Sequence, residues 1–205
     1  MKKKIKKHLA DGLLIVFSVL FALFINKLYD NYQTWRKKEI AMESIAKELY
    51  RNERVLKDWK ERHTQISEKL TQLIEGENDS LIGEIKKNKF FNIGLITENR
   101  SLIDDVLTST AWESAKTTGI ISEFDFETTQ KLTRVYAMQE VISEKTIIKI
   151  LDYYFEPGIH QMEDIEAILL QFQLRFTELV GQEALMAYLY EDIMKYFNDT
   201  KYAVP

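Results

Sequence analysis

The sequence predicts an all-α protein, in which an N-terminal transmembrane helix continues into a long coiled-coil-like helix and is followed by an antiparallel helical bundle. Three observations predict this fold. Residues 12–25 form a run of fourteen residues without a charge. Apolar residues between positions 42 and 73 then recur at alternating spacings of three and four, as in a helical seam. Finally, the 205 residues include only two prolines and seven glycines, so the residues that break helices are scarce.

The uncharged run is the core of the predicted membrane span. Residues 12–25 make about 21 Å of helix, whereas the hydrocarbon core of a bilayer is about 30 Å thick. Apolar residues on both sides extend the span to residues 9–29, or about 31 Å, with Asp11 and Lys27 at its polar boundaries. The predicted anchor residues are Gly12, Leu13, Leu14, Ile15, Val16, Phe17, Val19, Leu20, Phe21, Leu23, Phe24 and Ile25.

Two alternatives to a retained anchor have to be weighed. A cleaved export signal shares the basic start and the short apolar core. Its peptidase needs small residues soon after that core, and residues 24–29 offer none at the required positions. A soluble core helix would show one apolar stripe, but residues 12–25 are apolar on every side. The pattern therefore favours an uncleaved signal-anchor.

The distribution of lysines predicts the orientation of the span. Lys2, Lys3, Lys4, Lys6 and Lys7 precede it, whereas Lys27, Arg36, Lys37 and Lys38 follow it. Because positive residues stay preferentially in the cytoplasm, the bias predicts a cytoplasmic N-terminus with the bulk of the chain across the membrane.

Composition limits the function classes. Hydrophobic residues at 45% and charged residues at 29% are values of a globular domain. The whole chain carries a net charge of −4, and its first eleven residues carry five lysines and one aspartate, so residues 12–205 carry −8. Such an acidic domain is a poor match for nucleic acid, and the chain has no cysteine for disulfides or thiolate chemistry.

The predicted stalk helix, residues 30–76, carries an apolar seam that is interrupted by the polar residues Asn52 and His63. The seam consists of Met42, Ile45, Leu49, Asn52, Leu56, Trp59, His63, Ile66, Leu70 and Leu73. A single asparagine in a heptad seam typically sets the register and the number of chains. The seam therefore predicts either a homo-oligomer through residues 42–73 or packing on the chain's own helices. In the span, Ser18 and Ala22 form a small-xxx-small pair that could join two copies.

The rest of the chain, residues 77–205, is predicted to form the bundle, with residues 1–8 as a basic cytoplasmic tail. A glycine at position 76 ends the stalk, and a short helix is expected over residues 80–88. A second helix is expected over residues 101–118, closing on Gly119. Ser122 or Asp125 caps a third helix that runs to Phe155. A fourth covers residues 162–198 and is broken or bent around Gly181.

Motifs that carry chemistry are missing from the sequence. It has no Gly-x-Ser-x-Gly, no phosphate-binding glycine loop and no His-Glu-x-x-His, so no catalysis, cofactor or metal is predicted. His63 is interpreted as a polar seam residue, and His160 with Glu163 and Asp164 as a helix start rather than a metal site. Asp11 is interpreted as a boundary residue rather than the proton-binding aspartate of a motor stator.

The order of segments along nearly the whole chain resembles a known family. The lysine-rich start, the span ending in ALFINK, and the stretches LTSTAWESAKTTGI and LTRVYAMQEVI are similar to a family of small bacterial single-span membrane proteins of unknown function. The resemblance implies a retained anchor in a bacterial inner membrane, and no site residues. The helix motif of Ala111, Trp112, Ala115 and Gly119 offers a face on which another helix can approach closely, with the tryptophan as a structural plug.

These observations predict a function in outline. The chain is expected to be a membrane-anchored helical scaffold or interaction protein of the bacterial cell envelope, with the lipid bilayer and an unknown envelope protein as partners. The alternative is a ligand-sensing or transport-accessory subunit. Because only about ten residues precede the span, such a subunit would have to act through a membrane partner.

Overall fold

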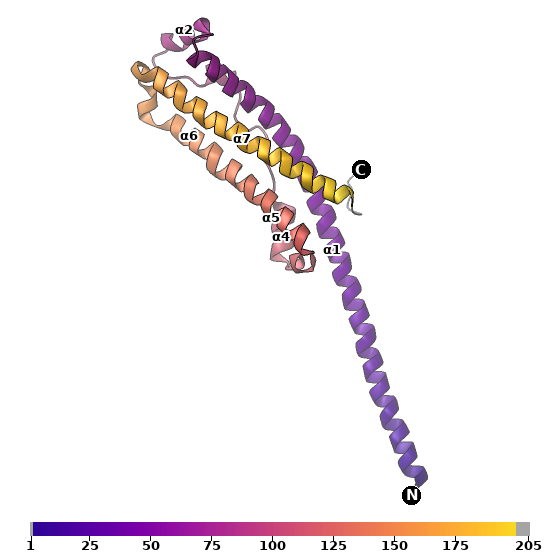
Figure 1. Cartoon of the computed structure of the whole chain (residues 1–205). Helices are drawn as coiled ribbons and strands as arrows, with labels where there is room; N and C mark the ends of the chain where they lie inside the picture. Colours follow the sequence, from indigo (N-terminus) through magenta and orange to yellow (C-terminus); the bar gives the residue numbers. More distant parts are fainter. Residues whose placement is uncertain (1, 200–205) are drawn as a thin grey trace.

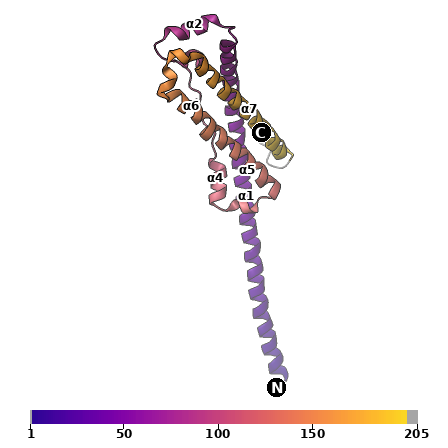
Figure 2. The ribbon, with the colours of Figure 1, turned by 60° about the vertical axis from the view of Figure 1, so that its left-hand side comes forward.

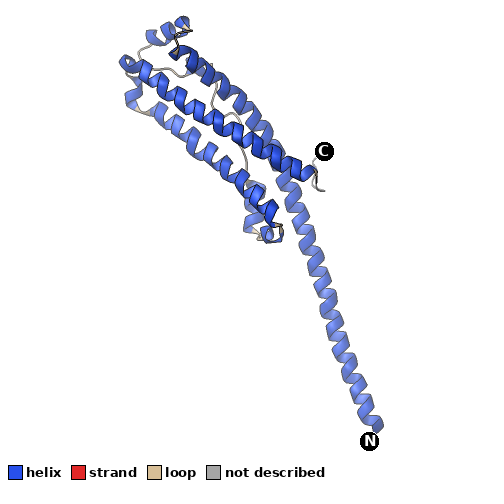
Figure 3. Ribbon diagram, viewed as in Figure 1, coloured by secondary structure: helices blue, strands red, loops and turns tan. Residues whose placement is uncertain are grey.

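The computed structural model describes residues 2–199 of the chain, with side chains from residue 12 onward. All regular structure in this range is helical, which confirms the predicted fold class (Figures 1 and 3). The elements are α1 (Lys2–Ile74), α2 (Asp79–Lys87), α3 (Gly94–Thr97), α4 (Thr110–Thr117), η1 (Ile120–Glu123), α5 (Phe126–Glu140), η2 (Val141–Thr146), α6 (Ile147–Phe155), η3 (Pro157–His160), η4 (Met162–Asp164) and α7 (Ile165–Asn198).

Helix α1 joins the predicted span to the bundle without interruption. Its first part projects alone from the bundle, and its second part is one of the bundle helices (Figures 1 and 2). The helix contains one segment long and apolar enough to cross a membrane, and none of that segment is buried in the chain's own core. The side chains of the lysine-rich tail and of Asp11 lie outside the described part, so their predicted roles stay predictions.

The apolar seam of α1 packs on the chain's own helices. Every residue of the seam, from Met42 to Leu73, is buried, and α1 packs most extensively against α7, which runs back along it toward the span (Figure 1). The continuous helix of α5, η2 and α6 packs mainly on α7 and completes the core. Of the two alternatives that the sequence left open, the structure shows packing on the chain's own helices, which cover the ten seam residues.

The prediction of a helix over residues 101–118 is wrong for its first half. Residues 98–109, here called the strap, are irregular, and α4 begins only at Thr110. Side chains of α1 hold the strap: Lys69 Nζ lies 2.5 Å from Glu98 Oε1, and Arg62 donates to the Ser101 carbonyl at 2.9 Å. A helix would have satisfied these backbone groups internally, but α1 supplies the partners instead.

Charged pairs hold the strap further along α1. Arg62 also pairs with Asp104, and its hydrogen bond keeps the pKa of that carboxyl below its usual value. Arg51 Nη2 reaches Asp105 Oδ1 at 3.2 Å. The two adjacent aspartates are therefore used against α1 rather than on an exposed helix face.

The predicted helix boundaries at Gly76, Gly119 and Asp125 are confirmed, whereas the interiors of two long helices differ from the prediction. Gly76 and Gly119 both have φ of 74°, as left-handed helix ends require. Asp125 caps α5 by accepting from the Thr128 N–H at 2.8 Å, so of the two candidates the aspartate is the cap. The helix expected to reach Phe155 contains a π-helical turn, η2. Helix α7 continues through Gly181 without the predicted break.

Candidate functional site

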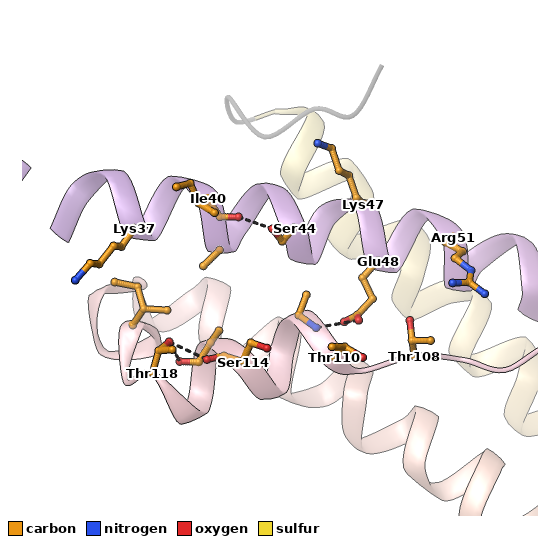
Figure 4. Close-up of a pocket in the computed structure, with 14 residues that line it drawn as sticks. Lys37, Ile40, Ser44, Lys47, Glu48, Arg51, Thr108, Thr110, Ser114 and Thr118 are labelled. Atoms are coloured by element: carbon orange, nitrogen blue, oxygen red, sulfur yellow. Dashed lines mark hydrogen bonds between the residues drawn. The ribbon is translucent and has the colours of Figure 1, made fainter. Parts of the chain in front are cut away.

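A groove lies between α1 and α4 on the bundle (Figure 4). Its volume is about 900 Å³, and it is lined by the part of α1 from Lys37 to Arg51, by Thr108 of the strap, by α4 and by the start of η1. Helix α4 and η1 form the end of the bundle nearest to the projecting part of α1 (Figures 1 and 2). The groove therefore lies at the end of the domain that faces the predicted span.

Glu48 forms the wall at the far end of the groove. Its Oε2 accepts from the Ala111 N–H at 2.9 Å, and its Oε1 accepts from the Tyr136 hydroxyl at 2.7 Å. Because Ser109 makes no side-chain cap, the carboxylate caps α4 from another helix. Burial and the neighbouring Glu48 raise the pKa of Tyr136, so its hydroxyl stays protonated and keeps donating. One carboxylate thus joins α1, α4 and α5.

Asn52 holds the strap one turn further along α1. Its side chain accepts from the Thr108 N–H at 3.0 Å and donates to the Thr108 carbonyl at 2.6 Å. It also donates to Gln139 Oε1 at 3.2 Å, and that oxygen accepts from the Tyr190 hydroxyl at 3.3 Å. Asn52 is fully buried, so the polar seam residue fixes the register of the strap within one chain.

The charges around the groove are not equivalent. Lys47 pairs with Glu43 at 2.7 Å and Arg51 pairs with Asp105 at 3.2 Å. Lys37, by contrast, has no carboxylate within 4.0 Å among the residues that the structure describes. Lys37 and Arg51 lie at opposite ends of the groove, with the free cation at the end nearest to the projecting helix (Figure 4).

The floor of the groove between these charges is mainly apolar, with hydroxyl side chains in the lining that include Ser44, Thr110, Ser114 and Thr118. Ile40 and Ala41 contribute from α1, Ala111 and Ala115 from α4, and Ile120 from η1. Ile40 is 55% exposed, so it presents apolar surface to the groove. An elongated ligand with an apolar body and one negative end fits this arrangement.

A second polar cluster lies deep in the bundle. His63 Nδ1 is 2.6 Å from Glu183 Oε1, and His63 Nε2 is 3.0 Å from the Leu102 carbonyl oxygen. A carbonyl only accepts, so Nε2 carries a proton and donates it to Leu102. The contact between Nδ1 and Oε1 holds a second proton, which makes the pair neutral as a unit. His63 and Glu183 have no exposed surface, so the cluster joins α1, α7 and the strap and is closed to a substrate.

The structure brings some predicted site residues together and separates others. Trp112 stacks on Tyr136 with ring centroids 5.3 Å apart, and the small Ala111 and Ala115 face α1, so the motif serves the contact between α1 and α4. Gly119 instead ends the helix in a left-handed conformation. Residues Ile45, Leu49, Leu56 and Trp59 lie in the core beside Asn52.

Ser18 and Ala22 of the predicted span and His160 are not part of the groove. Ser18 and Ala22 are exposed, and the Ser18 hydroxyl donates to the Leu14 carbonyl of its own helix at 2.8 Å. The His160 ring lies edge-on to Tyr154 with centroids 5.7 Å apart. No group of three His, Asp or Glu side chains suited to a metal ion occurs in the described range.

Sequence reasoning missed an exposed apolar stripe on α7, here called the outer stripe. It consists of Ala167, Leu170, Leu174, Thr177, Gly181, Ala184 and Tyr188. The spacing alternates between three and four residues, and every member is exposed. Leu170, Leu174 and Tyr188 are exposed by 44%, 53% and 60%. The signal was present in the sequence, but the buried apolar residues of α7 lie between these positions and conceal it.

Comparisons with known proteins add no relative. No family model, no curated protein and no solved structure matches this chain. The family resemblance therefore stays a prediction, and the function has to be argued from the anchor, the outer stripe and the groove.

Proposed function

We propose that the chain is a single-pass, signal-anchored helical scaffold of the bacterial cell envelope that self-associates through the outer stripe and performs no catalysis. The observation that carries this proposal is the outer stripe itself. A solvent-exposed helix face rarely carries apolar residues at alternating spacings of three and four residues over several turns unless another helix covers it. The seam of α1 cannot take this role, because it is already covered within the chain.

The anchor favours a second copy as the occupant of the outer stripe. Two copies inserted in the same bilayer with the same orientation present their α7 helices in parallel. In a parallel pair each stripe residue faces its own counterpart, so Gly181 and Ala184 let the backbones approach closely while leucines pack at one end.

The flanking residues are compatible with the same pairing. In a parallel coiled coil the residue just before each a position of the heptad, the g position, lies opposite the e position five residues further along the partner helix. With Ala167, Leu174 and Gly181 at a positions, this rule can be applied to α7. On α7 this rule pairs Glu166 with Gln171, Gln173 with Glu178, and Val180 with Leu185. No like charges meet, and the last pair is apolar.

A single introduced cysteine tests the self-association. The chain has no cysteine of its own, so any disulfide formed by an Ala184→Cys variant joins two chains. We expect this variant of the full chain, in membranes under mild oxidation, to form a cross-linked dimer seen by non-reducing electrophoresis. The matched control is Ala137→Cys, an exposed alanine on α5 away from the outer stripe, which should stay monomeric.

A second substitution separates loss of association from loss of folding. A Cβ at Gly181 meets no atom within 4 Å, and leucine is a better helix former than glycine, so Gly181→Leu preserves the monomer. It places a large side chain where the two helices come closest. Adding it to the Ala184→Cys variant should reduce the cross-linked fraction about tenfold. Equal cross-linking at positions 184 and 137 would contradict the proposal.

The location of the protein is tested separately. The full-length chain is expected to stay in the membrane pellet after alkaline carbonate washing, because about 20 apolar residues insert stably in a bilayer. A reporter at the C-terminus should be active outside the cytoplasm, as the lysine bias predicts. A mature chain found in the aqueous extract, or lacking its first thirty residues, would contradict the anchor; a reporter active in the cytoplasm would contradict the orientation.

The groove favours a second candidate function, that of a ligand-sensing or transport-accessory subunit. A volume of about 900 Å³ lies within the range of small-molecule sites. Such a subunit would pass its signal to a membrane partner. The two candidates differ in what purification from native membranes should recover: a second copy for the scaffold, and a different membrane protein for the accessory subunit.

A further inference from the structure

We propose that the groove between α1 and α4 holds one acyl chain of an anionic phospholipid from the bilayer, with the lipid phosphate at Lys37. This inference rests on the membrane anchoring proposed above, and it adds a ligand that self-association does not require. It is carried by the position of the groove, by its charges and by its apolar floor.

The groove lies within reach of the lipid headgroups. Lys37 follows Tyr29, the last residue of the predicted span, by eight positions, or about 12 Å along the helix. The headgroup layer occupies about 5–7 Å on each side of the hydrocarbon core. The flexible side chain of Lys37, which is exposed, can extend over the remaining distance toward a phosphate.

The charges of the groove match the polarity of such a lipid. Lys37, which has no carboxylate within 4.0 Å in the described part of the chain, lies at the end nearest to the predicted span, where a phosphate would be. The Glu48 carboxylate lies eleven residues further along α1, or about 16 Å away, and its oxygens are occupied by Ala111 and Tyr136. An anionic headgroup therefore meets a positive charge and is distant from the negative one.

The floor of the groove suits an acyl chain. Small residues on both helices, Ala41 on α1 and Ala111 and Ala115 on α4, leave a channel, and Ile40 and Ile120 add branched apolar walls. The groove is open on one side and hydroxyl groups such as Ser114 also line it, so an acyl chain in it remains partly exposed to water. Contact with the apolar floor offsets part of the cost of leaving the bilayer, and the contact between phosphate and Lys37 adds to the affinity.

The test uses the full chain reconstituted in phosphatidylcholine vesicles with or without phosphatidylglycerol. After extraction in a mild detergent, native mass spectrometry measures the phospholipid retained by each chain. Wild type is expected to retain a single phosphatidylglycerol. Ser114→Trp fills the groove from α4 and should lower the retained lipid about tenfold. The matched control is Thr117→Trp, an exposed residue of α4 that does not line the groove, and it should retain the lipid like wild type.

A charge reversal tests the headgroup contact. Lys37→Glu should reduce the preference for phosphatidylglycerol over phosphatidylcholine about tenfold while leaving the groove open. The inference is overturned if Ser114→Trp retains as much lipid as wild type, or if Lys37→Glu keeps the preference. Displacement of the bound lipid by inorganic phosphate would also overturn it, because it would indicate a site for a free anion.

Sedimentation of the same vesicles separates this inference from the anchoring on which it rests. A chain that leaves the vesicles on carbonate washing contradicts the anchor. A chain that stays in the vesicles but retains no phosphatidylglycerol contradicts only the lipid in the groove.

Discussion

Replacing His63 with leucine should lower the free energy of unfolding by about 3–5 kcal/mol, since it removes one partner of a buried charged or proton-sharing pair. Glu183 would then remain fully buried, and its second oxygen, Oε2, already lacks a hydrogen-bond partner among the described residues. The Leu102 carbonyl would lose its donor as well. Urea unfolding of the full chain in detergent micelles, followed by tryptophan fluorescence, measures the loss.

The double variant His63→Leu, Glu183→Leu is the matched control. Replacing both members by apolar residues of similar size removes the unpaired carboxylate, so its destabilisation should be smaller than that of His63→Leu alone. Glu183→Gln keeps a hydrogen-bonding group opposite Nδ1 and should fall between wild type and His63→Leu. If the destabilisation of the double variant equals the sum of those of His63→Leu and Glu183→Leu alone, the pair is not coupled in the way the geometry indicates.

Replacing Asn52 with leucine should destabilise the fold by about 2–4 kcal/mol and leave the oligomeric state unchanged. The substitution leaves the Thr108 N–H without its acceptor, and a buried unsatisfied polar group contributes about 1–3 kcal/mol of destabilisation. Gln139 loses a donor in the same step, although it still donates to the Thr108 carbonyl at 3.1 Å. Unfolding in detergent and mass measurement by light scattering give the two quantities.

The oligomeric state of the Asn52→Leu variant decides between the two roles of Asn52. An asparagine that specified the number of chains would change that number when replaced by leucine. An asparagine that holds the strap should alter only stability and the hydrogen exchange of residues near Thr108. Tyr50→Leu, at an exposed position on the same helix, serves as the control for a leucine added to α1. A change in mass for Asn52→Leu would contradict the intramolecular seam.

The parts of the fold that the sequence predicts correctly are those set by neighbouring residues. The α1 seam is a periodic pattern, and Gly76 and Asp125 act on helix ends within a few residues of themselves. The strap could not be predicted in this way. Its residues are compatible with a helix, but Arg62, His63 and Asn52, distant in sequence, supply hydrogen bonds that a local pattern does not contain.

The candidate site was harder to predict than the fold. Glu48 and Tyr136 are separated by 88 positions, so their contact depends on how α1 and α5 pack. Among the cations that line the groove, Lys37 differs from Lys47 and Arg51 because no carboxylate of the described residues lies within 4.0 Å of it, and this difference depends on the three-dimensional arrangement. The seam pattern marks Asn52 as a special residue, and the structure decides between its two interpretations. The sequence also predicts a structural role for Trp112, but its partner, Tyr136, follows only from the packing of α4 near α5.

Helix α1 has a mechanical consequence. Between Gly12 and Gly76 it contains neither glycine nor proline, so it has no hinge at which the part outside the bundle could bend independently. A tilt, rotation or shift of the projecting part of α1 is therefore transmitted directly to the bundle. For a span inserted as proposed above, a thicker or thinner bilayer would change the tilt of α1, and the orientation of the bundle and its distance from the lipid surface would change with it.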